Sequence, residues 1–162
     1  MKPPNRKRIE PEGVFVKKST LPGVGKGLFT RRAIAKGERI IEYKGRITTF
    51  KQVQESGIVN PYIYYVNRNH VIDAMGFPES AGRYVNDAEG PVTMPGCSNN
   101  ARFIVINKRV FFEAITDILP GSEIFVSYGK GYWETIAFNQ LVEKSYGSTQ
   151  KSKPKNDNHR PG

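Results

Sequence analysis

The stretch Glu123-Ile124-Phe125-Val126-Ser127-Tyr128-Gly129 decides the fold, because it closes an ordered series of motifs. An ordinary strand ending in Tyr-Gly would explain these residues if they stood alone. Upstream, in order, lie Gly23-Val24-Gly25-Lys26-Gly27, Tyr43-Lys44-Gly45, and Gly82-Arg83-Tyr84-Val85-Asn86 with its later partner Asn99-Asn100-Ala101. Each upstream motif is weak by itself, so the argument rests on their joint occurrence in one order.

The first glycine motif is not a phosphate-binding P-loop, because no Ser or Thr follows Lys26 and the GxxxxGK[ST] spacing is missing. It also does not open a helix as G-x-G-x-x-G does, because Leu28-Phe29-Thr30 continues as a strand. Glycine has no side chain and tolerates positive φ, so this turn can bring bare backbone close to a ligand. A plain hairpin turn is the alternative.

The length of 162 residues fits one domain with tails, and the net charge of +10 is unevenly placed. Residues 9–143 hold sixteen basic and fourteen acidic residues, so the excess lies in the two ends. Basic ends predict weak, salt-sensitive contact with nucleic acid, and solvated disorder is the alternative. Cys97 is the only cysteine, which excludes an intrachain disulfide and a cysteine-based zinc site. We expect no metal, no membrane association, and an intracellular location, cytoplasmic or nuclear.

Short runs of β-branched and aromatic residues between Gly and Pro predict a mainly β protein of antiparallel strands. The expected strands are residues 14–17, 27–30, 39–43, 62–66, 71–73, 103–106, 109–114 and 123–127. Within residues 62–66, alternation puts Tyr62 and Tyr64 on one face and Tyr65 on the other. A helix is expected at residues 50–56, capped by the preceding threonines, and another at 132–146, where apolar residues recur at helical spacing.

Between about residues 13 and 133, the four motifs resemble those of the SET-domain protein-lysine methyltransferases. The resemblance implies a β-clip-like fold of short strands with a knot-like C-terminal crossing and one or two short helices. It divides the chain into a basic N-terminal tail (1–11), a SET domain with a C-terminal lid helix (12–146) and a disordered basic tail (147–162). It also implies methyl transfer from S-adenosylmethionine to a lysine of a histone or another basic protein.

The resemblance carries site roles onto matching positions of this chain. Tyr128 takes the position of the family's catalytic tyrosine, and Tyr43 that of a wall residue of the channel for the target lysine. Phe103 stands where some relatives have a water-binding tyrosine that limits methylation, so we predict capacity beyond monomethylation. The implied cofactor-binding residues are Gly25, Lys26, Gly27, Tyr84, Asn86, Asp87, Tyr128 and Trp133.

The family pattern R-F-x-N-H-S-C-x-P-N is altered in this chain. Asp87-Ala88 replaces His-Ser, Asn99 replaces Pro, and a loop of roughly ten residues is inserted between them. Asp87 in place of histidine leaves open a catalytically weakened SET-like binding module. The basic tails leave open a second alternative, a chromatin or nucleic-acid adaptor. Zinc-binding cysteines of many relatives are also missing, so the segment 132–146 is expected to complete the lysine channel.

Overall fold

The structure is a computed structural model, and it describes residues 13–150. The chain divides into two compact units, Met1–Tyr128 and Gly129–Gly162. The predicted N-terminal tail, and all of the predicted C-terminal tail after Gln150, lie outside the described residues.

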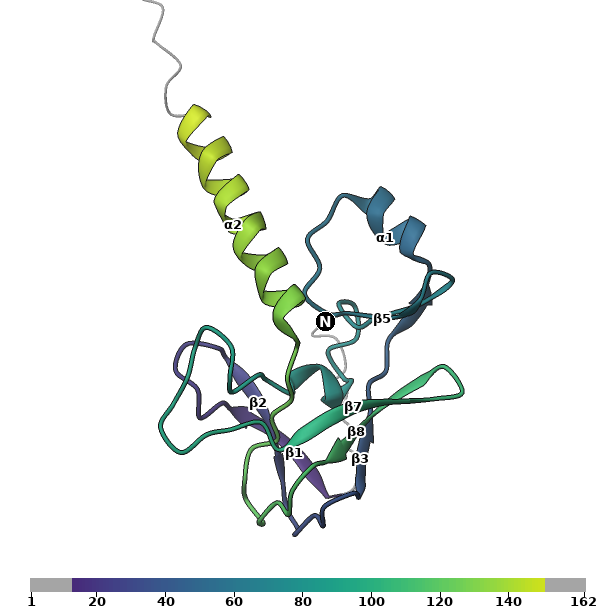
Figure 1. Cartoon of the computed structure of the whole chain (residues 1–162), viewed down its shortest axis with the longest axis vertical. Coiled ribbons are helices and arrows are strands. Elements are labelled where there is room, and N and C mark those ends of the chain that lie inside the picture. Colours follow the sequence, from purple (N-terminus) through teal and green to yellow (C-terminus); the bar gives the residue numbers. More distant parts are fainter. Residues whose placement is uncertain (1–12, 151–162) are drawn as a thin grey trace, which may run out of the picture. The chain divides into compact units, whose positions relative to one another are not determined.

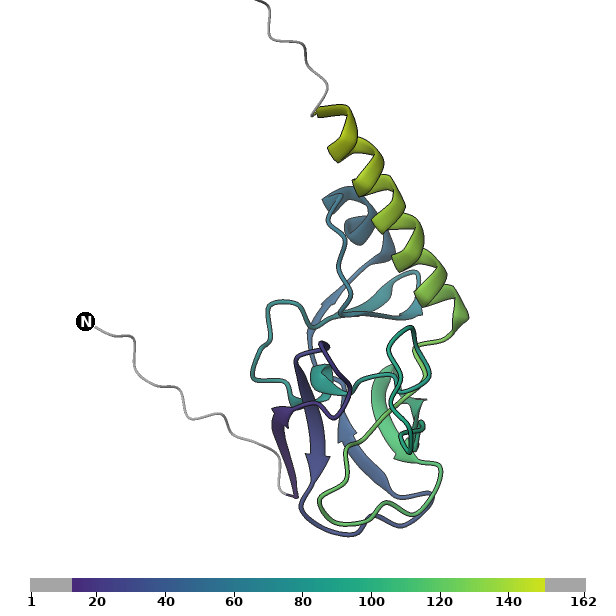
Figure 2. The same ribbon diagram turned by 90° about the vertical axis from the view of Figure 1, so that its left-hand side faces the viewer.

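The first unit is built from short antiparallel strands in three small sheets (Figures 1 and 2). One sheet is the hairpin of β1 (Val14–Lys18) and β2 (Lys26–Thr30). The second has the order β3 (Arg39–Glu42), β8 (Arg109–Ala114), β7 (Ala101–Ile106). The third has the order β4 (Arg46–Thr48), β6 (His70–Asp73), β5 (Ile63–Asn67). Mainly β architecture is therefore confirmed, and β4 is a short strand that the sequence did not predict.

The helix α1 (Phe50–Ser56) forms where it was predicted, with the predicted threonine cap. The Thr49 hydroxyl accepts a hydrogen bond from the Gln52 backbone N–H at 3.2 Å. In return, the Gln52 side-chain oxygen accepts one from the Thr49 N–H at 3.2 Å. This capping box satisfies two backbone donors that the helix itself leaves without acceptors. Gly57 then ends the helix in the left-handed conformation, with φ of 63°.

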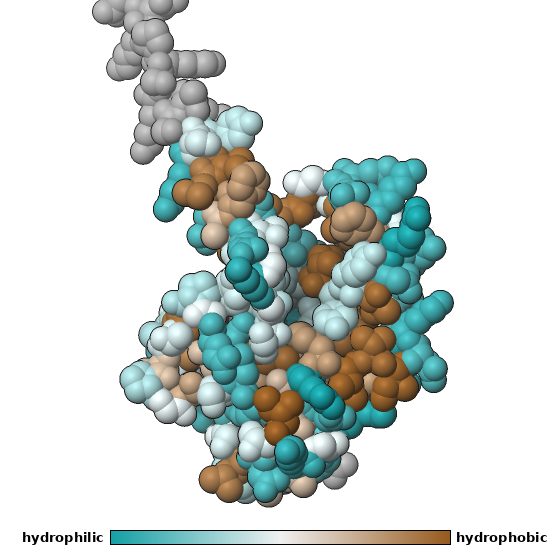
Figure 3. Space-filling view, viewed as in Figure 1, coloured by the Kyte–Doolittle hydropathy of each residue, from teal (hydrophilic) through white to brown (hydrophobic). Residues whose placement is uncertain are grey.

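One main hydrophobic core joins the three sheets. Its fully buried side chains include Leu28, Ile34, Val110, Phe112, Ile124 and Val126. Tyr62 and Tyr64 are half-buried against this core, whereas Tyr65 is 54% exposed. The predicted division of the tyrosines between two faces is thus confirmed. On the outside, Figure 3 shows a hydrophobic patch over the β7–β8 hairpin, where Val105 and Ile106 are exposed.

The segment 123–127 is not the continuous strand that was predicted. It forms single β-bridges and changes partner along its length: Glu123 pairs with Phe29, Phe125 with Asn86, and Val126 with Ala101. The Asn100 side chain replaces part of a regular ladder, because its Nδ2 donates to the Glu123 carbonyl at 2.9 Å and its Oδ1 accepts from the Phe125 N–H at 2.8 Å. A segment that crosses between several partners cannot keep one strand register.

The salt bridge between Glu42 and Arg109 fastens β3 to β8 next to Tyr43. Arg109 donates to both carboxylate oxygens, from Nε at 2.9 Å and from Nη2 at 2.7 Å. Hydrogen bonding from Arg109, more than the attraction of its charge, lowers the pKa of the Glu42 carboxyl below its ordinary value.

Acid is expected to weaken the fold through Glu42. A carboxyl whose pKa is lowered on folding stabilises the native state above its unfolded pKa of about 4.3, and that stability is lost as the pH falls through the lower folded value. Urea unfolding of the wild type and Glu42→Gln between pH 6 and 3 measures the effect. The variant should lose less free energy of unfolding below about pH 4 than the wild type. Parallel pH curves would contradict this role.

The second unit contains the helix α2 (Lys130–Gln150). The predicted helix at 132–146 lies inside it, and α2 continues past the predicted start of disorder at residue 147. Among residues 13–150, no helix is long and apolar enough to cross a membrane.

Candidate functional site

The turn between β1 and β2 is organised around a buried carboxylate. Glu123 is 5% exposed, and its Oε1 accepts a hydrogen bond from the Ser19 hydroxyl at 2.7 Å. Its Oε2 accepts from the Thr20 backbone N–H at 2.7 Å. The Ser19 N–H also donates to the Gly25 carbonyl at 2.8 Å, and Gly25 has a φ of 84°. The turn is therefore tied to the 123–128 segment.

Gly27 is needed for this arrangement because the Glu123 carboxylate occupies the space beside it. A Cβ at residue 27 would stand 2.0 Å from Glu123 Oε1 and 2.7 Å from Cδ. Gly27 is itself buried, and its φ is not in the left-handed region. In this structure the missing side chain makes room for the carboxylate, whereas Gly25, whose Cβ would meet open space, lies at the exposed part of the turn.

Lys26 faces a second lysine across the hairpin. The register places Lys18 directly opposite Lys26, and both residues are exposed. Like charges opposite one another destabilise an antiparallel pair. An anionic group of a ligand placed at this end of the hairpin would reduce that repulsion.

Asn86 joins the turn to the closing segment. Its Nδ2 donates to the Lys26 carbonyl at 2.9 Å and to Glu123 Oε1 at 3.3 Å. Its own carbonyl accepts from the Val126 N–H at 2.9 Å. The structure thus brings together three segments that the motifs had singled out, around residues 26, 86 and 123.

The two departures at residues 87 and 99 are partners of each other. The Asn99 Nδ2 donates to Asp87 Oδ1 at 3.0 Å, and Asn99 Oδ1 accepts from the Ala88 N–H at 2.9 Å. The Glu89 N–H donates to Asp87 Oδ1 at 2.9 Å, and the Tyr128 N–H to Oδ2 at 3.0 Å. Asp87 is buried, so these bonds compensate for burying its carboxylate. The altered pattern therefore builds a connected local structure that holds the Tyr128 backbone.

The Tyr128 side chain is held by separate contacts from those of its backbone. Its hydroxyl donates to the Val85 carbonyl at 2.5 Å, and its ring packs against the main core. Three consecutive residues therefore hydrogen-bond to the end of the 123–128 segment: Val85 and Asp87 to Tyr128, and Asn86 to Val126.

An aromatic cluster contains the two other predicted catalytic-site residues. The Tyr43 ring lies 6.2 Å from that of Phe103, and the Tyr64 ring lies 4.7 Å from Phe103, measured between ring centroids. Phe112 closes the cluster at 4.9 Å from Phe103. The Tyr43 hydroxyl donates to the Tyr62 carbonyl at 2.8 Å. Burial raises the pKa of the Tyr64 hydroxyl, so that hydroxyl is neutral near pH 7.

Two further predicted cofactor residues have other partners. Tyr84 ends the 3₁₀ helix η1 (Ala81–Tyr84), and its hydroxyl donates to the Pro78 carbonyl at 2.7 Å. Trp133 belongs to α2 in the second unit, where its ring meets that of Tyr132 edge-on at 5.0 Å. Sequence reasoning assigned no role to Glu123 or Ser19, although Glu123 begins the most specific motif. Among residues 13–150, no three His, Cys, Asp or Glu side chains group as metal ligands would.

Comparison with known proteins gives one family and several relatives. The family model described as the SET domain matches residues 25–129. The N-lysine methyltransferase KMT5A-A of Danio rerio is 25% identical over 119 residues, covering 67% of this chain and 33% of that protein. The histone-lysine N-methyltransferase NSD3 of Mus musculus is 29% identical over 129 residues, covering 75% of this chain and 8% of that protein.

Solved structures give the same fold. The methyltransferase domain of human PR domain-containing protein 2 superposes with a TM-score of 0.55 at 28% identity, covering 75% of this chain and 80% of that one. A chain of an active polycomb repressive complex 2 in the basal state gives a TM-score of 0.57 at 29% identity, covering 72% of this chain and 15% of that one. This chain spans only about a third, or less, of the two curated relatives named above.

Proposed function

The chain belongs to the SET domain family, and from that premise we propose that it is a protein-lysine N-methyltransferase that uses S-adenosylmethionine. The observation that carries the proposal is the convergence on the 123–128 segment. This single segment is bonded to the glycine turn through Glu123 and to residues 85–87 through Tyr128.

The residues around the β1–β2 turn fit the proposed cofactor. S-adenosylmethionine, when bound, supplies a methyl group on a positively charged sulfur and also carries a carboxylate. Exposed Lys18 and Lys26 suit that carboxylate electrostatically, and Gly25 leaves the backbone of the turn accessible. The Asn86 side chain holds the turn in place. Tyr84, Asp87 and Trp133 remain proposed cofactor residues, Asp87 acting through the Tyr128 backbone.

The aromatic cluster suits the target lysine. A lysine amine has an ordinary pKa of about 10.4 and is nearly always protonated in water at pH 7. Desolvation against Tyr43, Tyr64 and Phe103 favours the neutral amine, which is the nucleophile. The Tyr128 hydroxyl, held by the Val85 carbonyl, is proposed to orient that amine. Catalysis would then come from positioning and electrostatics rather than from a dedicated base.

The protein substrate is proposed to be a histone or another basic protein, since the relative NSD3 is named a histone-lysine N-methyltransferase. We also propose that α2 serves as the lid of the lysine channel, and that the basic ends add weak contact with nucleic acid. An intracellular location, cytoplasmic or nuclear, belongs to the same proposal.

Labelled S-adenosylmethionine tests the activity directly. The purified chain is incubated with the label and a panel of histones and other basic proteins, and labelled residues are mapped by mass spectrometry. Label on lysine side chains supports the proposal and identifies the substrate. Cofactor binding without transfer to any member of the panel would favour the SET-like binding module instead.

The residue at position 103 is expected to set the number of methyl groups. With excess cofactor the wild type should form di- or trimethyl-lysine, because a phenyl ring between Tyr64 and Phe112 cannot hold a water that blocks further transfer. Phe103→Tyr should slow the second transfer about tenfold, about 1.4 kcal/mol of barrier, while leaving the first. Mass spectrometry of the product lysine measures both steps. A wild type that yields only monomethyl-lysine would contradict this assignment.

A further inference from the structure

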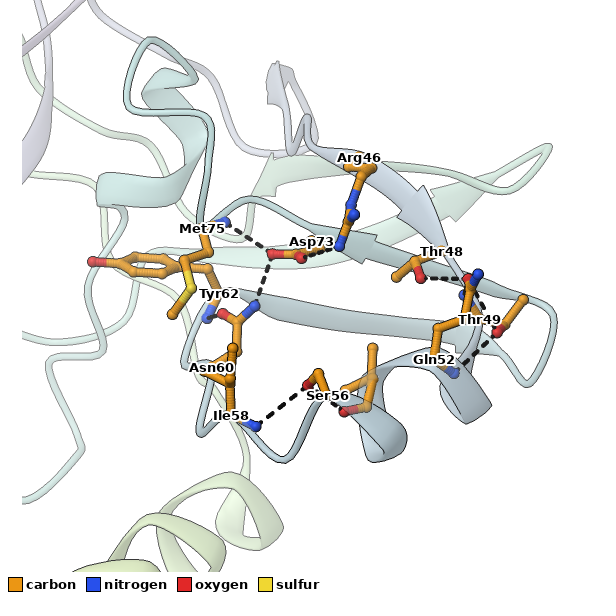
Figure 4. Close-up of polar contacts among 11 residues, drawn as sticks. Arg46, Thr48, Thr49, Gln52, Ser56, Ile58, Asn60, Tyr62, Asp73 and Met75 are labelled. Atoms are coloured by element: carbon orange, nitrogen blue, oxygen red, sulfur yellow. Dashed lines mark hydrogen bonds and ion pairs between the residues drawn. The ribbon is translucent and has the colours of Figure 1, made fainter.

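A polar cluster around Asp73 lies at the end of β6 (Figure 4). Asp73 Oδ1 accepts hydrogen bonds from Asn60 Nδ2 at 2.8 Å and from the Met75 N–H at 3.0 Å. Its Oδ2 accepts from Arg46 Nη2 at 3.2 Å. The Asp73 side chain is 14% exposed and that of Arg46 is 68% exposed. The Asn60 bond is therefore partly shielded from water, whereas the Met75 bond is exposed and the solvated ion pair contributes little.

Asn60 connects Asp73 to the backbone of Tyr62, which in turn binds the Tyr43 hydroxyl. Its Oδ1 accepts from the Tyr62 N–H at 2.9 Å, which fixes the backbone where the loop enters β5. The Tyr62 carbonyl then accepts twice, from the Ala74 N–H at 3.0 Å and from the Tyr43 hydroxyl at 2.8 Å. A continuous series of hydrogen bonds thus runs from Asp73 through Asn60 and Tyr62 to the hydroxyl of Tyr43.

Two motif residues converge on the same turn. Arg83 Nη1 donates to the Ala74 and Met75 carbonyls at 3.0 and 2.9 Å, and its guanidinium lies 4.0 Å above the Tyr62 ring. Gly45 packs against the Asp73–Ala74 peptide, and a Cβ at residue 45 would stand 2.4 Å from the Asp73 carbonyl oxygen. The turn after Asp73 is therefore held from both sides, and the Asn60–Asp73 bond joins the Ala74–Tyr62 backbone bond in tying it to the loop before β5.

That loop needs such a tie because a hollow lies beneath it. The space, of about 420 Å³, is lined by Val53, Ile58, Asn60, Asp73 and Phe77 among others, between α1 and the third sheet. Packing alone does not fill this space, so hydrogen bonds must set the position of the loop. A shift of the loop would move Tyr62 and with it the acceptor of the Tyr43 hydroxyl.

We infer that Asn60 and Asp73 form a clamp that positions, through the backbone of Tyr62, the Tyr43 and Tyr64 rings of the aromatic cluster for the target lysine. The hydrogen bonds described above make up the clamp, and its effect on the lysine substrate rests on the proposed function. It acts on the lysine side alone, because its bonds do not involve the β1–β2 turn, Asn86 or Glu123. Loss of the clamp should impair use of the lysine substrate and spare cofactor binding.

The test uses single variants and their reciprocal exchange in the full chain. Asn60→Asp places two carboxylates together, and Asp73→Asn removes the charged acceptor. The double variant Asn60→Asp/Asp73→Asn restores the bond between residues 60 and 73 with donor and acceptor exchanged, since the carboxylate at 60 can accept from both the Tyr62 N–H and the amide at 73. The Met75 N–H, which shares Asp73 Oδ1 with Asn60, is not given back its acceptor by this exchange. Arg46→Gln is the matched control, because it removes only the solvated ion pair.

Each single variant should lower kcat/KM for a lysine peptide by about tenfold to a hundredfold, the range expected for misplacing a reactive group. The dissociation constant of S-adenosylmethionine should stay within about twofold, and the double variant should recover most of the loss. The control should behave as the wild type. Unchanged kcat/KM in folded single variants, equal loss of cofactor binding, or no recovery in the double variant would each overturn the clamp.

Amide hydrogen exchange separates this inference from the proposed function. Protection of the Tyr62 amide should fall in the single variants and return in the double variant, whether or not methyl transfer occurs. A wild type without activity but with this pattern would reject the methyltransferase proposal and keep the clamp. If a single variant fails to fold, Asn60→Ala replaces it, because alanine removes the bond to Asp73 without placing two carboxylates together. Wild-type rates of amide exchange in Asn60→Ala would still overturn the clamp.

Discussion

Tyr128→Phe is expected to lower kcat for methyl transfer by about a hundredfold to a thousandfold, as loss of one oriented hydrogen-bonding group at a reacting centre does elsewhere. The removed hydroxyl donates to the Val85 carbonyl at 2.5 Å, next to Asn86 and Asp87. The phenyl ring can keep its packing against the core, and the Tyr128 N–H keeps its bond to Asp87. Stability and cofactor affinity should therefore change little, and steady-state kinetics with labelled cofactor measures the loss.

The matched control is Tyr65→Phe, which removes a hydroxyl from an exposed tyrosine on the neighbouring sheet. Tyr65 stacks edge-on against Phe50 at 5.7 Å on the face away from the core. Its kcat should equal that of the wild type. Full activity in Tyr128→Phe, or equal losses in both variants, would remove Tyr128 from the catalytic centre.

The strand pattern and the motif order were enough to predict the fold, because both are local signals. Alternation in 62–66 correctly divided its tyrosines, and the threonines before residue 50 correctly predicted the cap of α1. The segment 123–127 misled the same reasoning. Its composition is that of a strand, but its partners lie on three different segments, and pairing with distant residues is not encoded in a local run.

The site was less predictable because its polar contacts join residues far apart in sequence. Glu123 meets Ser19 across 104 positions, and Asn60 meets Asp73 across 13. A single sequence contains no signal for such pairs. The substitutions at 87 and 99 illustrate the same limit: each looked like a loss when considered alone, and together they form a hydrogen-bonded pair.

Gly45 shows how a correct motif can have an unexpected physical reason. A glycine after a strand usually supplies a turn with positive φ. Gly45 has no such φ, and its importance comes from the Asp73–Ala74 peptide that packs against its Cα. The requirement is one of space, set by β6 from nearly thirty residues away.

Gly45→Ala is accordingly expected to destabilise the protein by about 3 kcal/mol, the upper end of the usual cost of overpacking. The added Cβ would stand 2.4 Å from the Asp73 carbonyl oxygen, 2.6 Å from its carbon and 2.8 Å from the Ala74 nitrogen. These are main-chain atoms, so no side chain can move aside, and β4 must separate from β6. Thermal unfolding should show a fall in Tm of about 10 °C.

Gly76→Ala is the control for Gly45→Ala, because it adds the same methyl group just beyond the same turn. A Cβ at Gly76 meets nothing within 4 Å, and its φ is outside the left-handed region. That variant should unfold at the wild-type temperature or slightly above it, since alanine restricts the unfolded chain more than glycine does. Equal melting temperatures for the two variants would mean that β4 and β6 can separate without cost. The close packing at Gly45 would then explain neither the glycine of the Tyr43-Lys44-Gly45 motif nor the position of Tyr43.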